Sequence, residues 1–258
     1  MGNLSQIFYR RIGLNNEEVS WTPAGINKII AYSQLSLPFD NLSVFNSPDT
    51  PFTRAYVEQK ILTKGQGGLC YELNSLFYEV MKENGVSTSL ITATVYDNAT
   101  NDWLALQETH VLSIIHVEGN AYLVDIGLGL KSPRVIVPLN GRIVTFQETQ
   151  YQVTKDVDFY YFNFKQAGEQ NWNIGYRFAT NYSSVSLGEL EINRQIITFD
   201  NKSPFNKGPL IAIFTTDGSR LLTPSNYTIT DAAGKTKYPL SPEVFKELAR
   251  EFTFPLLV

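Results

Sequence analysis

The sequence predicts an α+β protein in which a helical part, a β-rich part and a smaller mixed part pack together. Three observations support this fold class. The first 85 residues carry helix start signals, residues 86 to about 180 show an alternating apolar pattern, and the remainder mixes both kinds of signal. The chain has 258 residues, of which 43% are hydrophobic, so it can bury a sizeable core. We expect three domains, 1–85, 86–195 and 196–258.

The first part carries the start signals of two helices. Thr22 followed by Pro23 is typical of an N-cap with proline at the first helical position, and the isoleucines at 26, 29 and 30 then share one face. Thr53 can cap a further helix. Between them, LPFDNL (37–42) contains a proline that disfavours helix at the residue before it, which indicates a structured connector.

The middle part has the period-two pattern of strands. Its candidate strands are short, rich in β-branched and aromatic residues, and separated by Gly, Asn, Asp or Pro, which indicates an antiparallel sheet or barrel. They are STSLITATVY, THVLSIIHV, AYLVDIG, RVIVPL, GRIVTFQ and FYYFNF. In the last part, residues 186–199 fit helix or strand, PLIAIFTT indicates a strand before an Asp217-Gly218 turn, and Ser241-Pro242 opens a final helix.

Charge and cysteine content exclude several classes of protein. The net charge is −4 without long runs of one sign, which argues against a nucleic-acid partner. A single cysteine cannot form an internal disulfide, and no apolar run approaches the roughly 18 residues that span a bilayer. We therefore expect a soluble, cytoplasmic protein without a membrane segment, while the sequence leaves the oligomeric state open.

The single cysteine, Cys70, follows the glycine-rich stretch GQGG (65–68) and lies in the first turn of a predicted helix. Apolar residues from Leu69 to Met81 repeat with helical spacing. The positive end of the helix dipole favours a thiolate at this position, and the glycines allow a substrate to approach the backbone, whose N–H groups can stabilise an oxyanion. The pattern indicates a nucleophile, and an inert buried cysteine is the alternative.

A cysteine nucleophile needs a base, and the chain has only two histidines, His110 and His116. Both lie in the segment 109–129, which the pattern predicts to be a hairpin. Its second strand holds an acid, Asp125, among apolar residues. A buried carboxylate is costly without a partner, so we expect a histidine on the neighbouring strand to face it, as in a catalytic triad.

The register of this hairpin decides which histidine reaches Asp125. A two-residue turn at 119–120 would leave Asp125 on the face of His110 but four positions, roughly 13 Å, away from it. Direct pairing needs a hairpin midpoint between residues 117 and 118, through a wider loop or a bulge. We favour His110, because His116 lies near the turn, where a base is more exposed to solvent.

The motifs GQGGLCYELN, THVLSI and YLVDIGLG, preceded by LPFDNL, closely resemble those of the arylamine N-acetyltransferases. That family carries a cysteine in an Arg-Gly-Gly-x-Cys-Phe/Tyr-Glu motif, a downstream histidine and an aspartate in a Val-Asp-x-Gly-x-Gly run. These fall here on Cys70, His110 and Asp125. The resemblance covers the first 130 residues by motif and the rest by layout. It implies a papain-like (cysteine proteinase-like) arrangement of an N-terminal helical bundle with the nucleophile, a β-barrel with the histidine and aspartate, and a C-terminal α/β lid.

The resemblance also implies an activity: ping-pong acyl transfer from acetyl-CoA to the nitrogen of an arylamine, arylhydroxylamine or hydrazine, through an acetyl-cysteine. Acetyl-CoA is then a co-substrate and no tightly bound cofactor is expected. One cysteine and two histidines offer few of the ligands of a zinc site, so no metal is expected. The expected substrate-binding residues are Gly68, Leu69, Gly127, Leu128 and Gly129, although a tight turn would also explain the last glycine pair.

Three positions depart from the motifs of the family. Gln66 replaces the usual arginine, Asp40 replaces the usual glutamate, and Leu128 replaces an aromatic residue. We expect Gln66 and Asp40 to compensate for each other through a neutral hydrogen bond, and Leu128 to alter the choice of acceptor. Two other functions stay open at this point. One is a cysteine hydrolase or transglutaminase-like enzyme with the same triad, and the other is a binding homologue that has lost turnover.

Overall fold

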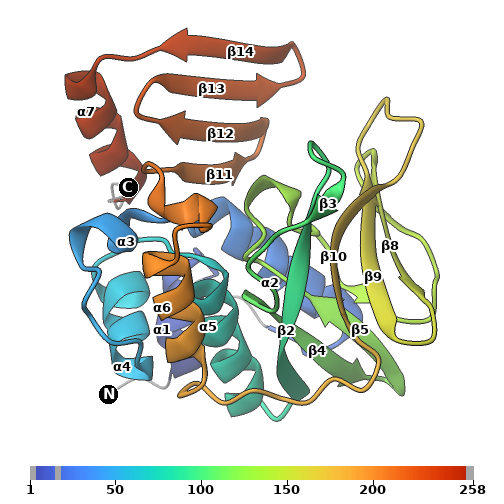
Figure 1. The fold of residues 1–258 in the computed structure, drawn as a ribbon. Helices are drawn as coiled ribbons and strands as arrows, with labels where there is room; N and C mark the ends of the chain where they lie inside the picture. The colour runs from blue at the N-terminus through green and yellow to red at the C-terminus, as the bar shows by residue number, and fades with distance from the viewer. Residues whose placement is uncertain (1–3, 15–18, 254–258) are drawn as a thin grey trace.

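The computed structural model describes residues 4–14 and 19–253, which form three groups of elements (Figure 1). The N-terminal helices lie beside a β-barrel, and a second sheet with a helix at one end lies above the helices in the view of Figure 1. The predicted α+β fold class, with a helical bundle, a barrel and a C-terminal α/β part, is confirmed. The domain boundaries at residues 85 and 195 stay a prediction.

The described residues of the N-terminal part form five α-helices and one π-helical segment. They are α1 (Leu4–Arg11), α2 (Pro23–Ser36), α3 (Leu42–Asn46), α4 (Arg54–Val57), the π-helical η1 (Glu58–Thr63) and α5 (Cys70–Glu83). Both predicted caps are confirmed: Thr22 Oγ1 accepts a hydrogen bond from a backbone N–H of the first turn of α2, and Thr53 Oγ1 does the same for α4. The connector 37–42 includes a two-residue strand, β1 (Phe39–Asp40), immediately before α3.

The middle part forms a nearly closed barrel with the strand order β6-β5-β4-β2-β10-β9-β8-β7, and β3 pairs with the end of β2. The elements are β2 (Ser87–Asp97), β3 (Asp102–Trp103), β4 (His110–Val117), β5 (Asn120–Val124), the 3₁₀ turn η2 (Gly129–Lys131), β6 (Val137–Pro138), β7 (Val144–Phe146), β8 (Thr149–Lys155), β9 (Phe159–Lys165) and β10 (Asn173–Ala179). Strands β8 and β10 have no counterpart among the predicted strands. Polar residues alternate with the buried Tyr151 and Val153 in β8, and an irregularity in register between Ile174 and Tyr176 interrupts the pattern in β10.

Strands β4 and β5 form the predicted hairpin, and its two-residue turn lies one position earlier than the turn at 119–120 considered for the register. Val117 pairs with Asn120, so Glu118 and Gly119 form the turn. Both have positive φ, 50° and 75°, as a type I′ hairpin turn requires. The pairing continues up to Ser113 and Val124. Asp125, the next residue, therefore points to the same side of the hairpin as His110 and lies diagonally opposite it, within reach of a long side chain.

The C-terminal part is a five-stranded antiparallel sheet in the order β1-β11-β12-β13-β14. Its other elements are α6 (Leu190–Phe199), the 3₁₀ turn η3 (Pro204–Asn206), β11 (Ile211–Thr215), β12 (Gly218–Thr223), β13 (Asn226–Asp231), β14 (Gly234–Pro239) and α7 (Pro242–Thr253). Because Phe39 pairs with Ala212 and Asp40 with Ile211, the N-terminal connector supplies the first strand of this sheet. The ambiguous segment 186–199 contains the helix α6, whose buried residues follow helical spacing.

Strand β4 separates two hydrophobic clusters. Val111 and Ile115 pack with the N-terminal helices, whereas Leu112 and Ile114 lie in the cluster that fills the barrel. Burial on both faces explains why this strand is almost continuously apolar. His110 follows the alternation of the barrel side, so its ring enters the end of the barrel. Within the part of the chain that the structure describes, no helix is both long enough and apolar enough to cross a membrane.

Candidate active site

Cys70 is the first residue of α5, the helix that packs against β2 and β4 of the barrel (Figure 1). The predicted position in the first turn of a helix is therefore confirmed. Leu69 is the N-cap, and its N–H donates a hydrogen bond to Glu72 Oε2 at 2.9 Å, which fixes the start of the helix. The Cys70 side chain is 5% exposed, and Sγ lies 3.8 Å from the carbonyl oxygen of Thr109, the residue before β4. The thiol thus faces the first residue of β4.

His110, that first residue, contacts both other members of the predicted triad. Its Nε2 lies 2.7 Å from Asp125 Oδ2, and the two side chains are 4% and 0% exposed. The Cys70 side chain is also close enough to the ring to contribute to its raised pKa. The structure therefore brings Cys70, His110 and Asp125 together in one buried line of sulfur, imidazole and carboxylate.

The pKa values of His110 and Asp125 are shifted in opposite directions. Burial alone would lower the pKa of His110, but the charge and hydrogen bond of Asp125, together with the contact with Cys70, raise it to about 10. Burial alone would raise the pKa of Asp125, but His110 and hydrogen bonds from Asn74 and Gly127 lower it below its usual value. At neutral pH the pair is therefore an imidazolium next to a carboxylate.

Asn74 holds the carboxylate of Asp125 in place. It lies four residues after Cys70 and thus on the same face of α5. Its Nδ2 donates to Asp125 Oδ1 at 2.8 Å and to the Val111 carbonyl at 2.7 Å, and its Oδ1 accepts from the Ile126 N–H at 2.9 Å. The sequence motifs alone assign Asn74 no role in the site. The i, i+4 spacing from the cysteine is the signal that could identify it.

Gly127 allows the strand end that carries Asp125 to approach the helix that carries Cys70. Its N–H donates to Asp125 Oδ1 at 2.8 Å. A Cβ at this position would lie 2.7 Å from Cys70 Cα and 2.7 Å from Asn74 Nδ2, distances that side chains do not tolerate. Glycine is therefore required here for the close approach of two backbones, not only for a tight turn.

Tyr176, on β10, packs against the histidine from inside the barrel. The centroids of the Tyr176 and His110 rings are 4.8 Å apart, and the Tyr176 side chain is fully buried. Burial and the neighbouring charge of Asp125 raise the pKa of the Tyr176 phenol well above its usual value, so the hydroxyl is neutral. No strand is predicted around Tyr176, so sequence reasoning does not place it at the site.

Cys70 and His110 line a pocket of about 390 Å³ between the barrel and the C-terminal sheet. Gly127, Leu128 and Gly129 line it, and their binding of substrate stays a prediction. The other lining residues are mainly aliphatic or aromatic, and Lys131 is the one charged side chain besides His110 among them: Phe39, Val95, Leu104, Leu106, Thr109, Leu130, Lys131, Ile197, Pro204, Phe205, Leu210, Ala212 and Leu221. An apolar pocket of this volume suits a small aromatic ligand.

Gly68 and Leu69, predicted to bind substrate, do not line this pocket. The Gly68 N–H donates to the Pro38 carbonyl and its own carbonyl accepts from the Asp40 N–H, so its backbone is paired with the connector. The Leu69 side chain is fully buried in the helical core. Both residues therefore fix the position of the start of α5, Gly68 through its backbone hydrogen bonds and Leu69 through its buried side chain.

The two motif departures near the nucleophile do not form the expected hydrogen bond with each other. The described residues show no hydrogen bond between Gln66 and Asp40. Instead, Lys60 Nζ lies 2.6 Å from Glu72 Oε1 in a buried ion pair and donates to Ser43 Oγ at 3.1 Å. Burial alone would lower the pKa of Lys60, but Glu72 and Asp40 raise it, so Lys60 supplies the positive charge behind the nucleophile's helix.

His116 lies at the other end of β4 from His110, exposed and paired with Ser87 and Ala121. It takes no part in the site. Among residues 4–14 and 19–253, no group of three or more His, Cys, Asp or Glu side chains could hold a metal ion.

Comparison with known proteins identifies the family. The sequence profile of the N-acetyltransferase family matches residues 24–256. An uncharacterised acetyltransferase of Bacillus subtilis, YvcN, is 32% identical over 93% of both chains. Arylamine N-acetyltransferase C from Bacillus anthracis is 27% identical, with a TM-score of 0.87 over 97% of this chain and 98% of that one.

A further structural match, the Bacillus cereus arylamine N-acetyltransferase described as having a unique Cys-His-Glu catalytic triad, is 26% identical. Its TM-score is 0.86 over 96% of both chains. This chain has aspartate, Asp125, beside its histidine. The profile match spans most of the chain, and the fold and the order of motifs agree with it. The chain belongs to the arylamine N-acetyltransferase family and is an acyltransferase.

Proposed function

We propose that this protein transfers an acetyl group from acetyl-CoA to the nitrogen of an arylamine, arylhydroxylamine or hydrazine, with Cys70, His110 and Asp125 as its catalytic residues. One observation carries the proposal: the only cysteine of the chain starts a helix, lies next to an imidazole that a buried carboxylate holds at 2.7 Å, and lines an apolar pocket. The family supports the acetyl group and the amine.

In the first half-reaction, the Cys70 thiolate attacks the thioester carbonyl of acetyl-CoA. A new S–C bond forms, the backbone N–H groups at the start of α5 stabilise the oxyanion, and the bond to the CoA sulfur breaks. The CoA thiolate takes the proton of the His110 imidazolium and leaves as the thiol. Acetyl-cysteine and a neutral imidazole remain.

In the second half-reaction, the amine attacks the acetyl-cysteine, and neutral His110 accepts the proton that the nitrogen loses. The C–S bond then breaks, and the Cys70 thiolate is regenerated next to the imidazolium. His110 can act as a base at this stage because acetylation removes the thiolate charge, one of the causes of its raised pKa. Asp125 and Asn74 keep the ring oriented throughout.

Intact-mass measurement after mixing with acetyl-CoA tests this reaction. We expect one acetyl group on the wild type, none on Cys70→Ala, and loss of the acetyl group when an arylamine such as aniline or a hydrazine is added. Acetylation of Cys70→Ala would contradict the assignment of the nucleophile.

The same experiment separates the alternatives. A cysteine hydrolase would release acetate without an amine, at a rate that aniline does not change. A binding homologue that has lost turnover would keep the acetyl group after the amine is added. In both cases the proposed acyl transfer to nitrogen is wrong.

A further inference from the structure

A second pocket, of about 550 Å³, lies on the other side of β1 from the triad. Asp40 lines this pocket whereas its neighbour Phe39 lines the active-site pocket, as expected from the alternation of a strand. In the same way Pro209 lines the second pocket and Leu210 the first. Neighbouring residues of β1 and of the segment 209–210 thus face different pockets, and the two pockets have no lining residue in common.

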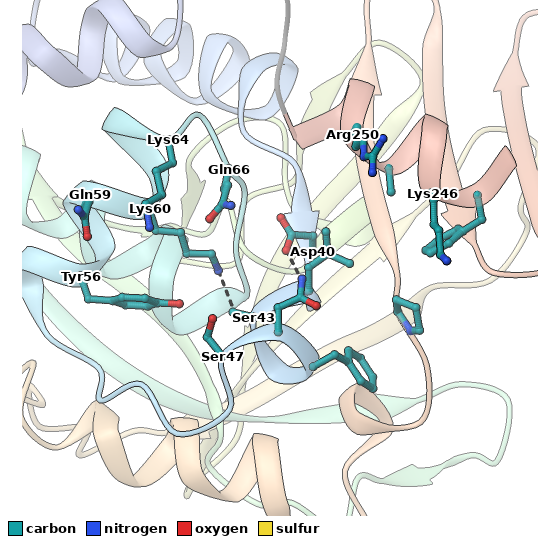
Figure 2. A pocket seen from close by; sticks show the side chains of 16 residues that line it. Asp40, Ser43, Ser47, Tyr56, Gln59, Lys60, Lys64, Gln66, Lys246 and Arg250 are labelled. Atoms are coloured by element: carbon teal, nitrogen blue, oxygen red, sulfur yellow. Dashed lines mark hydrogen bonds between the residues drawn. The ribbon is translucent and has the colours of Figure 1, made fainter. Parts of the chain in front are cut away.

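The second pocket is built from segments that are far apart in the sequence (Figure 2). One side comes from α4, η1 and the residues after them, including Tyr56, Gln59 and Lys64. The opposite side comes from α7, where Lys246 and Arg250 lie one turn apart on the same helix face. No single stretch of the sequence contains this cluster of basic residues, which is why sequence reasoning does not find it.

The charge of this pocket is opposite to that of the whole chain. Its lining includes Lys60, Lys64, Lys246 and Arg250 but only one acid, Asp40, although the chain has a net charge of −4. Lys60 is neutralised by Glu72. Within the described residues, neither Lys64 nor Lys246 takes part in a side-chain hydrogen bond or an ion pair. Their ammonium groups remain available to an anion.

The polar groups of the pocket are mostly hydrogen-bond donors or groups that can donate. The hydroxyls of Ser47 and Tyr56 and the amides of Gln59 and Gln66 line it with the basic residues. Asp40, 1% exposed, has one carboxyl oxygen without a hydrogen-bond partner among the described residues, and burial is the main cause of its raised pKa. Such a surface suits a ligand with several acceptor oxygens and more than one negative charge.

A phosphate monoester matches these features better than a carboxylate. It carries about −1.5 to −2 charge at pH 7 and three acceptor oxygens, whereas a carboxylate carries one charge and two oxygens. An arginine fork and lysine ammonium groups are common phosphate ligands in proteins. The volume of about 550 Å³ also leaves room for a small organic group attached to the phosphate.

We propose that the pocket between η1 and α7 is a binding site for a small phosphate monoester, separate from the acyl-transfer site. Lys64 and Lys246 contact the phosphate from opposite sides, with Arg250 beside Lys246. The ligand thereby joins the C-terminal helix to the N-terminal part of the chain.

Isothermal titration calorimetry of the full chain tests the proposal with three matched probes: glycerol 3-phosphate, glycerate and glycerol, at constant ionic strength set with chloride. We expect glycerol 3-phosphate to bind at least about tenfold more tightly than glycerate, because the pocket offers several cations. Glycerol should show no binding. Equal binding of glycerate, or no binding of glycerol 3-phosphate, would overturn the proposal.

Variants locate the site. Lys64→Ala and Lys246→Ala should each weaken binding of glycerol 3-phosphate on the order of fivefold, and the double variant more than either, since each removes one partly solvated charge. Lys235→Ala, an exposed lysine on β14 outside the pocket, is the matched control and should bind like the wild type. Unchanged affinity in the double variant would contradict the assignment.

Saturating CoA distinguishes this site from the acyl-transfer site. We expect glycerol 3-phosphate to bind equally well with and without CoA, and to bind Cys70→Ala like the wild type. Competition by CoA would show that the pocket receives part of the acyl donor, and the claim of a separate site would be wrong. Because the readout is binding, the result does not depend on acyl transfer.

Discussion

At His110 and Asp125, two opposite charges lie in a region almost closed to water. Each charge on its own would be strongly disfavoured there, and each is stabilised by the other. The hydrogen bonds from Asn74 and Gly127 satisfy the carboxylate oxygen that does not face the ring. The imidazole is therefore fixed in orientation and charge before any substrate enters, which is the property that a triad needs.

The ionisation of His110 can be followed directly. Because its pKa is raised to about 10, its ring should stay protonated through neutral pH and lose its proton near pH 10. The measurement is the pH titration of the imidazole carbon-bound protons by NMR. The chain has only one other histidine, so the variant His116→Gln assigns the remaining resonance. Titration of that resonance near pH 6.5 would contradict the ion pair.

The raised pKa of His110 also determines whether the free energy of unfolding rises or falls with pH. A raised pKa in the folded state means that His110 contributes stability below its usual pKa of 6.5, and that this contribution is lost as the pH rises through about 10. Urea unfolding at a series of pH values should therefore show the wild type losing stability relative to His110→Gln between pH 7 and 10.5. A constant difference over this range would argue against the raised pKa.

Replacement of Asp125 tests the role of the carboxylate. Asp125→Asn removes the charge that holds the imidazolium and should slow acetylation of Cys70 by acetyl-CoA on the order of 10³- to 10⁴-fold, as in other triads. Rapid-quench mass spectrometry measures this rate. Asp125→Glu keeps the charge, so its acetylation rate should fall less. A relative with 26% identity is described as having a Cys-His-Glu triad. A loss below about tenfold in Asp125→Asn would exclude an essential carboxylate.

At the scale of elements, the segment after β5 packs so closely against α5 that there is no space for a side chain at Gly127. Gly127→Ala would place a Cβ 2.7 Å from Cys70 Cα, so one backbone must move. We expect a loss of about 1–3 kcal/mol in the free energy of unfolding, as for other overpacked sites, together with slower acetylation of Cys70. Urea unfolding and the acetylation rate measure the two effects.

Gly208→Ala is the matched control for this prediction. A Cβ at Gly208 meets no atom within 4 Å, and its backbone does not need a positive φ. The variant should therefore differ little from the wild type in stability and acetylation rate. Equal behaviour of both glycine variants would show that the close approach at Gly127 does not matter.

Sequence patterns predict elements with a strong local signal and miss those set by distant contacts. The cap of α2 and the helix that begins at Cys70 are predictable because their signals lie within a few residues. The β4–β5 hairpin is predictable, but the local pattern leaves its exact turn residues open, since Glu118 adopts a positive φ that its side chain does not favour. The pairing of β1 with β11 joins residues 39 and 212, and no local pattern encodes it.

The same distinction holds for the site. Cys70, His110 and Asp125 follow from residue types and from the family motifs. Lys60 does not, because its role behind the nucleophile's helix depends on burial and on its distance from Glu72. The expected hydrogen bond between Gln66 and Asp40 is absent among the described residues. The Lys60–Glu72 ion pair is present instead, and it can be found only from the three-dimensional arrangement.

At the scale of the whole molecule, Arg134 joins the barrel to the C-terminal sheet. Its guanidinium carbon lies 4.7 Å from the ring centroid of Phe146 on β7 and 4.4 Å from that of Phe214 on β11. A planar guanidinium stacks between two rings, whereas an ammonium does not. Arg134→Lys keeps the charge and should lower the free energy of unfolding by about 1 kcal/mol.

Hydrogen exchange tests where that loss acts. In Arg134→Lys, amides of β11 should exchange faster than in the wild type, while those of α5 should not change. Arg142→Lys, an exposed arginine in the same region of the sequence, is the control. Unchanged exchange in β11 would mean that the stacked arginine does not hold the sheet against the barrel.

Strand β1 consists of only two residues, and each faces a different pocket. Its backbone also pairs on one side with β11 and on the other with Gly68, just before the nucleophile. Any change that displaces β1 must therefore alter both pockets and the start of α5 together. Efforts to re-engineer acceptor preference in this enzyme should therefore leave positions 39 and 40 untouched and vary the barrel side of the acyl-transfer pocket instead.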